Sequence, residues 1–277
     1  MTDLLLAILS STTVAVCMRL ATRDGQQRTG LLAVNYLTCT LIAYAYADKS
    51  LSLWRDGLGN VAFMSVMMGV FYLAGFLLFQ REMGKSGIVL STIFMKLGLL
   101  VPVVGSVLLF REEPTVRQGI GFLLALTAIV LINLPDGKRE GRFHGGLLLL
   151  LLTCGSGDLM SKVFEEWGEP RFREIYLTLA FGTAMLLCVI ITALRREKPE
   201  KKDVLYGVLL GIPNYYASRF LLLALKSLPA VVVYPTFSVG TLAAVTALGI
   251  CLFRERLRPR QWVAFGGILL ALLLLNI

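Results

Sequence analysis

Long apolar segments alternate with short charged ones along the whole chain. A membrane-spanning helix needs about 20 mostly apolar residues, and ten segments meet that condition. They are residues 3–21, 30–47, 58–79, 87–110, 116–134, 145–164, 174–194, 204–225, 229–252 and 260–276. The connections between them are short, so we expect no sizeable soluble domain. The first segment has no basic stretch before it and no small-residue cleavage site after it, which favours a span over a removed signal peptide.

Composition agrees with a polytopic membrane protein. Of the 277 residues, 56% are hydrophobic and 16% are charged, whereas soluble domains carry about 25% charged residues. This balance argues against a soluble enzyme and against a disordered chain. The net charge is +9. In a membrane protein such an excess of basic residues indicates cytoplasmic loops, so no nucleic acid is expected as a partner. The five cysteines all lie in apolar segments without CxxC spacing, so we expect no disulfide framework, metal or other cofactor.

The chain repeats itself. A shift of 143 residues places Phe110-Arg111-Glu112 on Phe253-Arg254-Glu255, and the same shift places Tyr72 on Tyr215. We therefore expect two repeats, residues 1–134 and 144–277, joined by a loop at 135–143. Each repeat holds five spans, and because five is odd the second repeat must cross the membrane in the opposite sense. The predicted fold class is all-α, with ten transmembrane helices in two inverted five-helix repeats, an arrangement typical of secondary transporters.

These motifs carry a resemblance to a known family. Ten spans in two sets of five, each with Phe-Arg-Glu after its fourth span, resemble the drug/metabolite transporter superfamily, in particular EamA-like permeases. Members usually have glycine before that glutamate, where this chain has Arg111 and Arg254. The segment Ala224–Ala230 is similar to the family's connection between the eighth and ninth spans. The resemblance implies a substrate cavity lined mainly by the first, third, fourth, sixth, eighth and ninth spans.

Charged residues inside the predicted spans are the first candidates for function. Lys96 lies near the middle of the fourth span, with Thr92 one helical turn before it. A charge at the bilayer centre costs at least about 2.5–3.5 kcal/mol, so Lys96 should face protein or water. It could bind an anionic substrate group or couple transport to protonation, or it could pair with Asp158 and only hold the bundle together. Asp158 is the candidate proton-coupling residue, although an intrahelical pair with Lys162 would explain it equally well.

Two polar stripes lie on spans that contain a proline, and prolines free backbone groups that need new partners. The stripe on the eighth span comprises Asn214, Tyr215, Ser218 and Arg219, after Pro213. The stripe on the ninth span comprises Tyr234, Ser238 and Thr241, beside Pro235. Tyr72 joins the candidates as the repeat mate of Tyr215. We expect these residues to bind substrate, whereas ordinary interhelical hydrogen bonding is the alternative for each stripe.

The charges suggest a substrate class. Lys96, Lys162 and Arg219 outnumber Asp158 in the central spans, which favours an anionic or zwitterionic small metabolite such as an amino acid. The predicted function is secondary transport by alternating access, in a chain that is not an enzyme. A lipid-handling protein or an efflux protein for hydrophobic drugs is the alternative. The single histidine argues against an intramembrane enzyme.

The connections predict an orientation. Most lysines and arginines lie in the odd-numbered connections, which places those in the cytoplasm and both termini outside. We expect a multi-pass protein of the cytoplasmic (inner) membrane, surrounded by lipid. Small residues on the fifth and tenth spans, such as Gly121 and Gly267, allow close helix packing within the monomer or in a homodimer.

Overall fold

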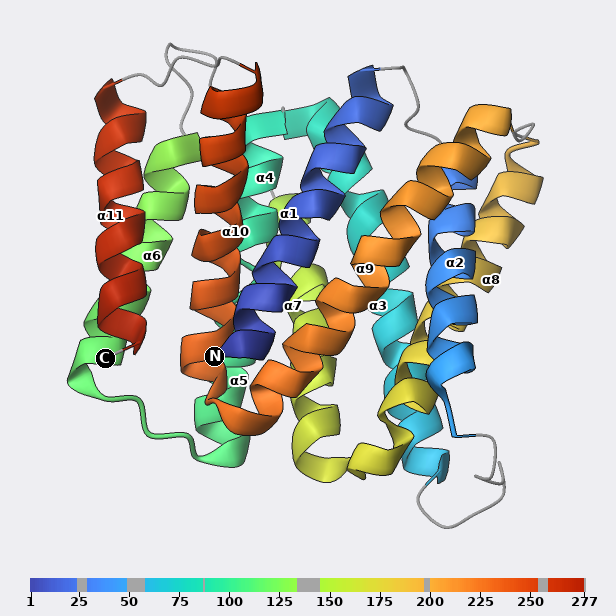
Figure 1. Ribbon diagram of the computed structural model, residues 1–277, viewed down its shortest axis with the longest axis horizontal. Helices are drawn as coiled ribbons and strands as arrows, with labels where there is room; N and C mark the ends of the chain where they lie inside the picture. Colours follow the sequence, from blue (N-terminus) through green and yellow to red (C-terminus); the bar gives the residue numbers. More distant parts are fainter. Residues whose placement is uncertain are drawn as a thin grey trace. The chain divides into compact units, whose positions relative to one another are not determined.

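The computed structural model describes residues 1–23, 29–48, 58–86, 88–133, 145–196, 200–253 and 259–276. These residues are almost entirely helical (Figure 1). The elements are α1 (Thr2–Arg23), α2 (Thr29–Tyr46), α3 (Leu58–Ser86), α4 (Ile88–Leu97), α5 (Leu100–Phe110), α6 (Val116–Asn133), α7 (Gly145–Trp167), the short 3-10 helix η1 (Pro170–Phe172), α8 (Arg173–Leu194), α9 (Lys201–Ser227), α10 (Ala230–Phe253) and α11 (Pro259–Asn276). Each predicted span falls on one helix or, for the fourth, on two.

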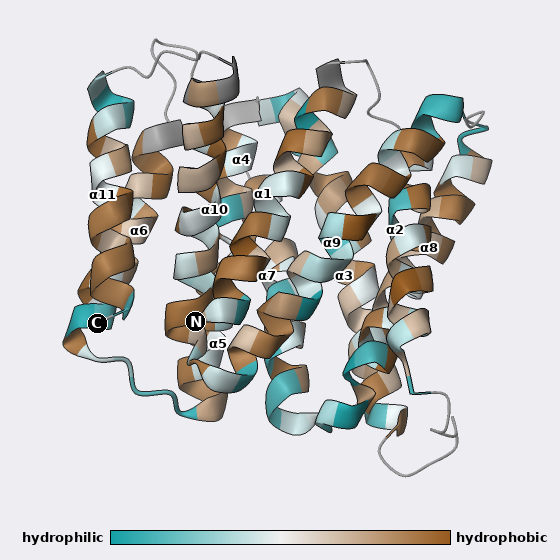
Figure 2. Cartoon of the chain, in the orientation of Figure 1, coloured by the Kyte–Doolittle hydropathy of each residue, from teal (hydrophilic) through white to brown (hydrophobic). Residues whose placement is uncertain are grey.

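Apolar surface marks the chain as an integral membrane protein. Among the described residues, nine candidate spans are long and apolar enough to cross a membrane, and Val116–Leu131 is a shorter apolar helix. Hydrophobic colours run along most of the helices, and the strongest hydrophilic colours gather mainly near helix ends (Figure 2). Large hydrophobic side chains remain exposed, including Leu108 at 73% and Val263 at 69%. Soluble proteins rarely expose so much apolar surface, whereas lipid accepts it.

Contacts divide the chain into two compact units. The first unit comprises Met1–Leu73 and Met160–Lys226, and the second comprises Ala74–Leu159 and Ser227–Ile277. Each unit therefore combines a part of each predicted repeat, because a repeat is a relation of sequence whereas a unit is defined by contact. The predicted connecting loop at 135–143 lies outside the described residues.

Close helix packing holds the first unit together. Helices α2 and α8 pack side by side (Figure 1). Helix α9 presents Gly207 and Gly211, four residues apart, to α2. A side chain at Gly211 would begin 2.7 Å from the backbone oxygen of Asn35. Small residues at this spacing let two backbones approach each other within a membrane.

In the second unit the predicted fourth span is interrupted. The predicted span over 87–110 corresponds to one candidate span, Leu90–Phe110, but within it α4 ends at Leu97 and α5 begins at Leu100. Pro102 has no backbone N–H to donate to Gly98, four residues earlier. The Gly98 oxygen instead accepts from the Val101 N–H at 2.9 Å, in a tighter turn. Lys96 thus lies in the last turn of α4, beside a break in the helix.

Two glycines bring this break against α7. A Cβ atom added at Gly155 would lie 2.2 Å from the Gly98 oxygen and 2.6 Å from the Val101 Cβ. A Cβ atom added at Gly98 would lie 3.1 Å from the Gly155 nitrogen. Backbone therefore meets backbone at this crossing, and Asp158 lies one turn further along α7.

The Phe-Arg-Glu motif at 110–112 ends α5, and its glutamate contacts the first turn of α10. Arg111 adopts a left-handed conformation with φ of 54°, and its N–H donates to the Ser106 oxygen. Glu112 accepts hydrogen bonds from the N–H groups of Ala230 and Val231, at 3.0 and 3.4 Å. N–H groups in the first turn of a helix have no acceptor within the helix. Glu112 supplies that acceptor and so caps α10. The repeat mates Arg254 and Glu255 lie outside the described residues.

The left-handed residue at the end of α5 leads to a prediction about stability. A non-glycine residue in this conformation destabilises the folded protein by roughly 1–2 kcal/mol. Glycine removes that cost, but its greater freedom in the unfolded chain offsets part of the benefit. Arg111→Gly should therefore stabilise the protein by about 0.5–1 kcal/mol. Thermal unfolding in detergent measures the change, and an unchanged or lower Tm would contradict it.

Candidate functional site

Lys96 and Asp158 form the centre of one polar cluster, in the second unit. Lys96 on α4 and Asp158 on α7 are both half-buried, and they attract each other electrostatically. In the described part of the chain they form no direct ion pair with each other, and neither charged group has a hydrogen-bonding protein partner. The two side chains thus lie within electrostatic range of each other without a direct contact between them. Thr92, one turn before Lys96, is also half-buried.

The predicted stripe on the ninth span lies in the same unit. Tyr234, Ser238 and Thr241 are all buried on α10. The Tyr234 hydroxyl donates to the backbone oxygen of Asp158 at 2.6 Å, which ties α10 to α7 at the charged residue. The Thr241 hydroxyl has no hydrogen-bond partner within the described ranges. Tyr234 is therefore the residue of this stripe that contacts the Lys96–Asp158 cluster, through its bond to the Asp158 backbone.

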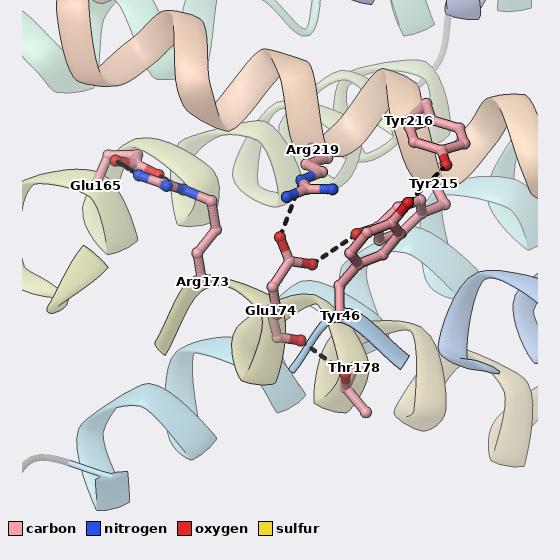
Figure 3. Close-up of polar contacts among 8 residues, drawn as sticks. All are labelled: Tyr46, Glu165, Arg173, Glu174, Thr178, Tyr215, Tyr216 and Arg219. Atoms are coloured by element: carbon pink, nitrogen blue, oxygen red, sulfur yellow. Dashed lines mark hydrogen bonds and ion pairs between the residues drawn. The ribbon is translucent and has the colours of Figure 1, made fainter. Parts of the chain in front are cut away.

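A second polar cluster, in the first unit, surrounds Arg219 (Figure 3). Its Nε lies 3.0 Å from Glu174 Oε1, and the Tyr215 hydroxyl donates to Glu174 Oε2 at 2.6 Å. The Arg219 guanidinium lies over the Tyr46 ring, 4.6 Å from its centroid. The Tyr46 and Tyr215 rings stack at 6.1 Å, and the hydroxyls of Tyr46 and Tyr216 are 3.3 Å apart.

The helices explain how this cluster forms. Tyr215 and Arg219 are four residues apart on α9, so both face Glu174 in the first turn of α8. Tyr46 is the last residue of α2, which packs along α8. A carboxylate in a first helical turn is stabilised by the helix dipole, which supports the charge of Glu174 at this end of the unit.

The other predicted residues of the first unit are more dispersed. The Asn214 amide donates to Asn35 Oδ1 at 3.4 Å, which links α9 to α2. Ser218 is half-buried on α9. Tyr72 lies beside Phe181, with ring centroids 6.2 Å apart. The structure therefore brings Tyr215 and Arg219 together through Glu174 and gives Asn214 a different partner.

Two cations of the central spans have partners that the sequence interpretation did not name. Lys162 pairs with Glu166, with Nζ 2.5 Å from Oε1, instead of with Asp158. Arg219 pairs with Glu174, so the apparent positive excess among the central charges is largely compensated. Glu166 and Glu174 stand at the ends of spans, where they look like residues of a solvated connection.

The same connection contains another buried pair. Arg173 donates to both oxygens of Glu165, from Nε at 2.8 Å and from Nη2 at 3.0 Å. The two side chains are only 12% and 3% exposed. This bidentate contact fastens α8 to the end of α7. The sequence interpretation did not single out this pair or Glu174, since charge density alone marked residues 165–174. It also did not single out Tyr46, at the end of α2.

The family follows from comparison with known proteins. The model of the EamA-like transporter family matches residues 3–134 and again residues 145–277. The chain belongs to the EamA-like transporter family. This EamA-like protein is thus a multi-pass membrane protein of the drug/metabolite transporter superfamily, whose members are transporters and not enzymes.

Individual relatives agree with that assignment. An uncharacterized protein of Haemophilus influenzae is 23% identical over 277 aligned residues, covering 95% of this EamA-like chain and 93% of its own. An uncharacterized transporter of Helicobacter pylori is 24% identical, covering 70% and 66% respectively. A protein of known crystal structure matches 99% of this chain and 94% of its own, with a TM-score of 0.77 and 16% identity. At that identity the match supports the fold alone.

Proposed function

We propose that this EamA-like protein is a secondary transporter that carries a small anionic or zwitterionic metabolite, such as an amino acid, across the cytoplasmic membrane. Transport would proceed by alternating access of the two inverted sequence repeats. Lys96 would bind the anionic group of the substrate. Thr92, Tyr72, Asn214, Tyr215, Ser218, Arg219, Tyr234, Ser238 and Thr241 are proposed as further binding residues, and Asp158 as the proton-coupling residue.

One observation carries this proposal. Lys96 lies inside a membrane-spanning segment, and within the described residues no carboxylate pairs with it directly. A charge at that depth costs several kcal/mol unless protein or water compensates it. Asp158 attracts it at longer range, and the helix break beside it leaves backbone groups without regular helical partners. A charged ligand at this position would complete the compensation.

A second function has one observation in its favour. Efflux of hydrophobic cations would need a carboxylate among aromatic rings, and Glu174 lies against Tyr215 and close to Tyr46. In this structure the cation over the Tyr46 ring is the protein's own Arg219. A cationic drug would therefore have to replace Arg219, which makes this the weaker candidate.

A ligand panel tests the proposal. A ligand that binds only the folded protein raises its apparent stability. We expect the detergent-purified protein to be stabilised by an amino acid or organic acid, at about 2.7 kcal/mol for a concentration 100 times the Kd. Sugars, nucleosides, lipids and cationic drugs complete the panel. Stabilisation by lipids or cationic drugs alone would contradict the proposal and favour the alternative.

A further inference from the structure

Arg219 keeps unused hydrogen-bond donors. Its Nε faces Glu174 and its plane lies over Tyr46, yet in the part of the chain that the structure describes neither terminal Nη group has a protein acceptor. The side chain is 28% exposed. An arginine held flat, with its terminal nitrogens accessible, is suited to bind a carboxylate through two parallel hydrogen bonds.

Glu174 is held firmly beside those donors. One carboxylate oxygen faces Arg219 at 3.0 Å and the other accepts from Tyr215 at 2.6 Å. The side chain is 15% exposed, and it lies in the first turn of α8, where the helix dipole attracts negative charge. Because both oxygens are engaged, Glu174 cannot turn away when a second carboxylate approaches Arg219.

The charge of the ligand then decides whether it is accepted. A simple anion at the Nη groups of Arg219 would stand close to the Glu174 carboxylate, and like charges in a desolvated site repel strongly. If the anion displaced Glu174 from Arg219, it would leave a buried carboxylate without its cation. A ligand with a positive charge next to its carboxylate avoids both penalties, because its cation can compensate Glu174.

We propose that Glu174 is a specificity-determining residue, which makes the Arg219 cluster selective for zwitterionic ligands over plain anions. This inference rests on the proposed function and narrows its substrate class. It assigns to Glu174 a role in rejection as well as in attraction, which is how selective sites commonly discriminate.

The pair of Arg219 and Glu174 could instead have a purely structural role, here called a strut, since it joins α8 to α9. The neighbouring pair of Arg173 and Glu165 has the features of a strut, because it is bidentate and its members are 12% and 3% exposed. The pair of Arg219 and Glu174 uses one guanidinium nitrogen and is more open. A test must therefore measure selectivity, which a strut would not change.

The experiment compares matched ligand pairs on the full-length purified protein. The probes are L-leucine with 4-methylpentanoate, L-glutamate with glutarate, and L-phenylalanine with 3-phenylpropanoate, each pair differing by one amino group. We expect the wild type to bind the preferred amino acid about tenfold or more tightly than its deaminated partner. Glu174→Gln should reduce that ratio to near one or invert it, and Glu174→Asp should keep it.

The control is Glu169→Gln, the same change in an exposed ion pair of the same unit, which should leave the ratio unchanged. An unaltered ratio in folded Glu174→Gln would overturn the inference while leaving the proposed function intact. So would a wild type that prefers the deaminated acids, a result that needs no variant. If no amino acid or organic acid, among the three pairs or in the wider panel, stabilises the wild type, the proposed function itself fails.

Discussion

Replacing Gly155 by leucine should abolish folding of the protein. Even the first side-chain atom at this position would lie 2.2 Å from the Gly98 oxygen and 2.6 Å from the Val101 Cβ. The obstacle is backbone of the broken fourth span, which cannot rotate away as a flexible side chain could. Overpacking of a core costs about 1–3 kcal/mol and sometimes more, and a clash with backbone belongs at or above the upper end of that range.

Size-exclusion chromatography of the detergent-solubilised protein measures this effect. We expect no monodisperse peak for Gly155→Leu and a markedly lower Tm for the milder Gly155→Ala. Gly266→Leu is the matched control, because a Cβ at Gly266 meets nothing within 4 Å and the residue is exposed. A normal elution profile for Gly155→Leu would mean that α7 does not approach the helix break this closely.

The helical segments could be predicted because length and apolarity alone determine them. A stretch of about 20 apolar residues has few alternatives to a spanning helix, since lipid cannot satisfy its backbone groups. The break in the fourth span was also open to prediction. Pro102 stands four residues after Gly98 within that span, and proline removes the hydrogen bond at that spacing. The prediction rested on the length and apolarity of the span and did not use the position of Pro102.

The charge pairs could not be predicted in the same way. Glu174 and Arg219 lie on different helices, 45 residues apart in sequence, and only the packing of α8 against its neighbours brings them together. The Glu166 pair with Lys162 has helical spacing, but so does the alternative with Asp158, and spacing does not choose between them. Composition therefore overestimated the net positive charge of the central spans. Of the three cations there, Lys162 and Arg219 are paired with glutamates, and Lys96 has no direct carboxylate partner within the described residues.

The surroundings of Asp158 link it to Lys96 in the proposed mechanism. Since Lys162 is paired with Glu166, Asp158 is released from the purely intrahelical role that its spacing suggested. Its carboxylate lies within electrostatic range of Lys96 and of the Cys154 thiol, and its backbone oxygen accepts from Tyr234. It lies one turn beyond the Gly98–Gly155 crossing. A proton or a charged ligand arriving there would change the balance of charge at a point where the backbone is already irregular.

Lys96→Met should leave the folded protein intact and reduce uptake roughly 100-fold or more. Methionine has similar length and no charge, so the loss would be the charged contact with substrate, which typically contributes about 2–5 kcal/mol when the partner is buried. Uptake into proteoliposomes of the ligand that the panel identifies gives the measurement. Lys85→Met, the same change at an exposed position of the same unit, should transport normally. Retained uptake in Lys96→Met would remove this residue from the binding site.

Asp158→Asn then separates binding from proton coupling. If the carboxylate carries the coupled proton, the variant should still bind ligand but lose the pH dependence of uptake, since asparagine cannot exchange a proton. A pH profile equal to that of the wild type would assign the proton to another group. Because Lys96 and Asp158 interact, their effects on ligand binding should be non-additive in the double variant. Strict additivity would indicate that the two residues act at separate steps of transport.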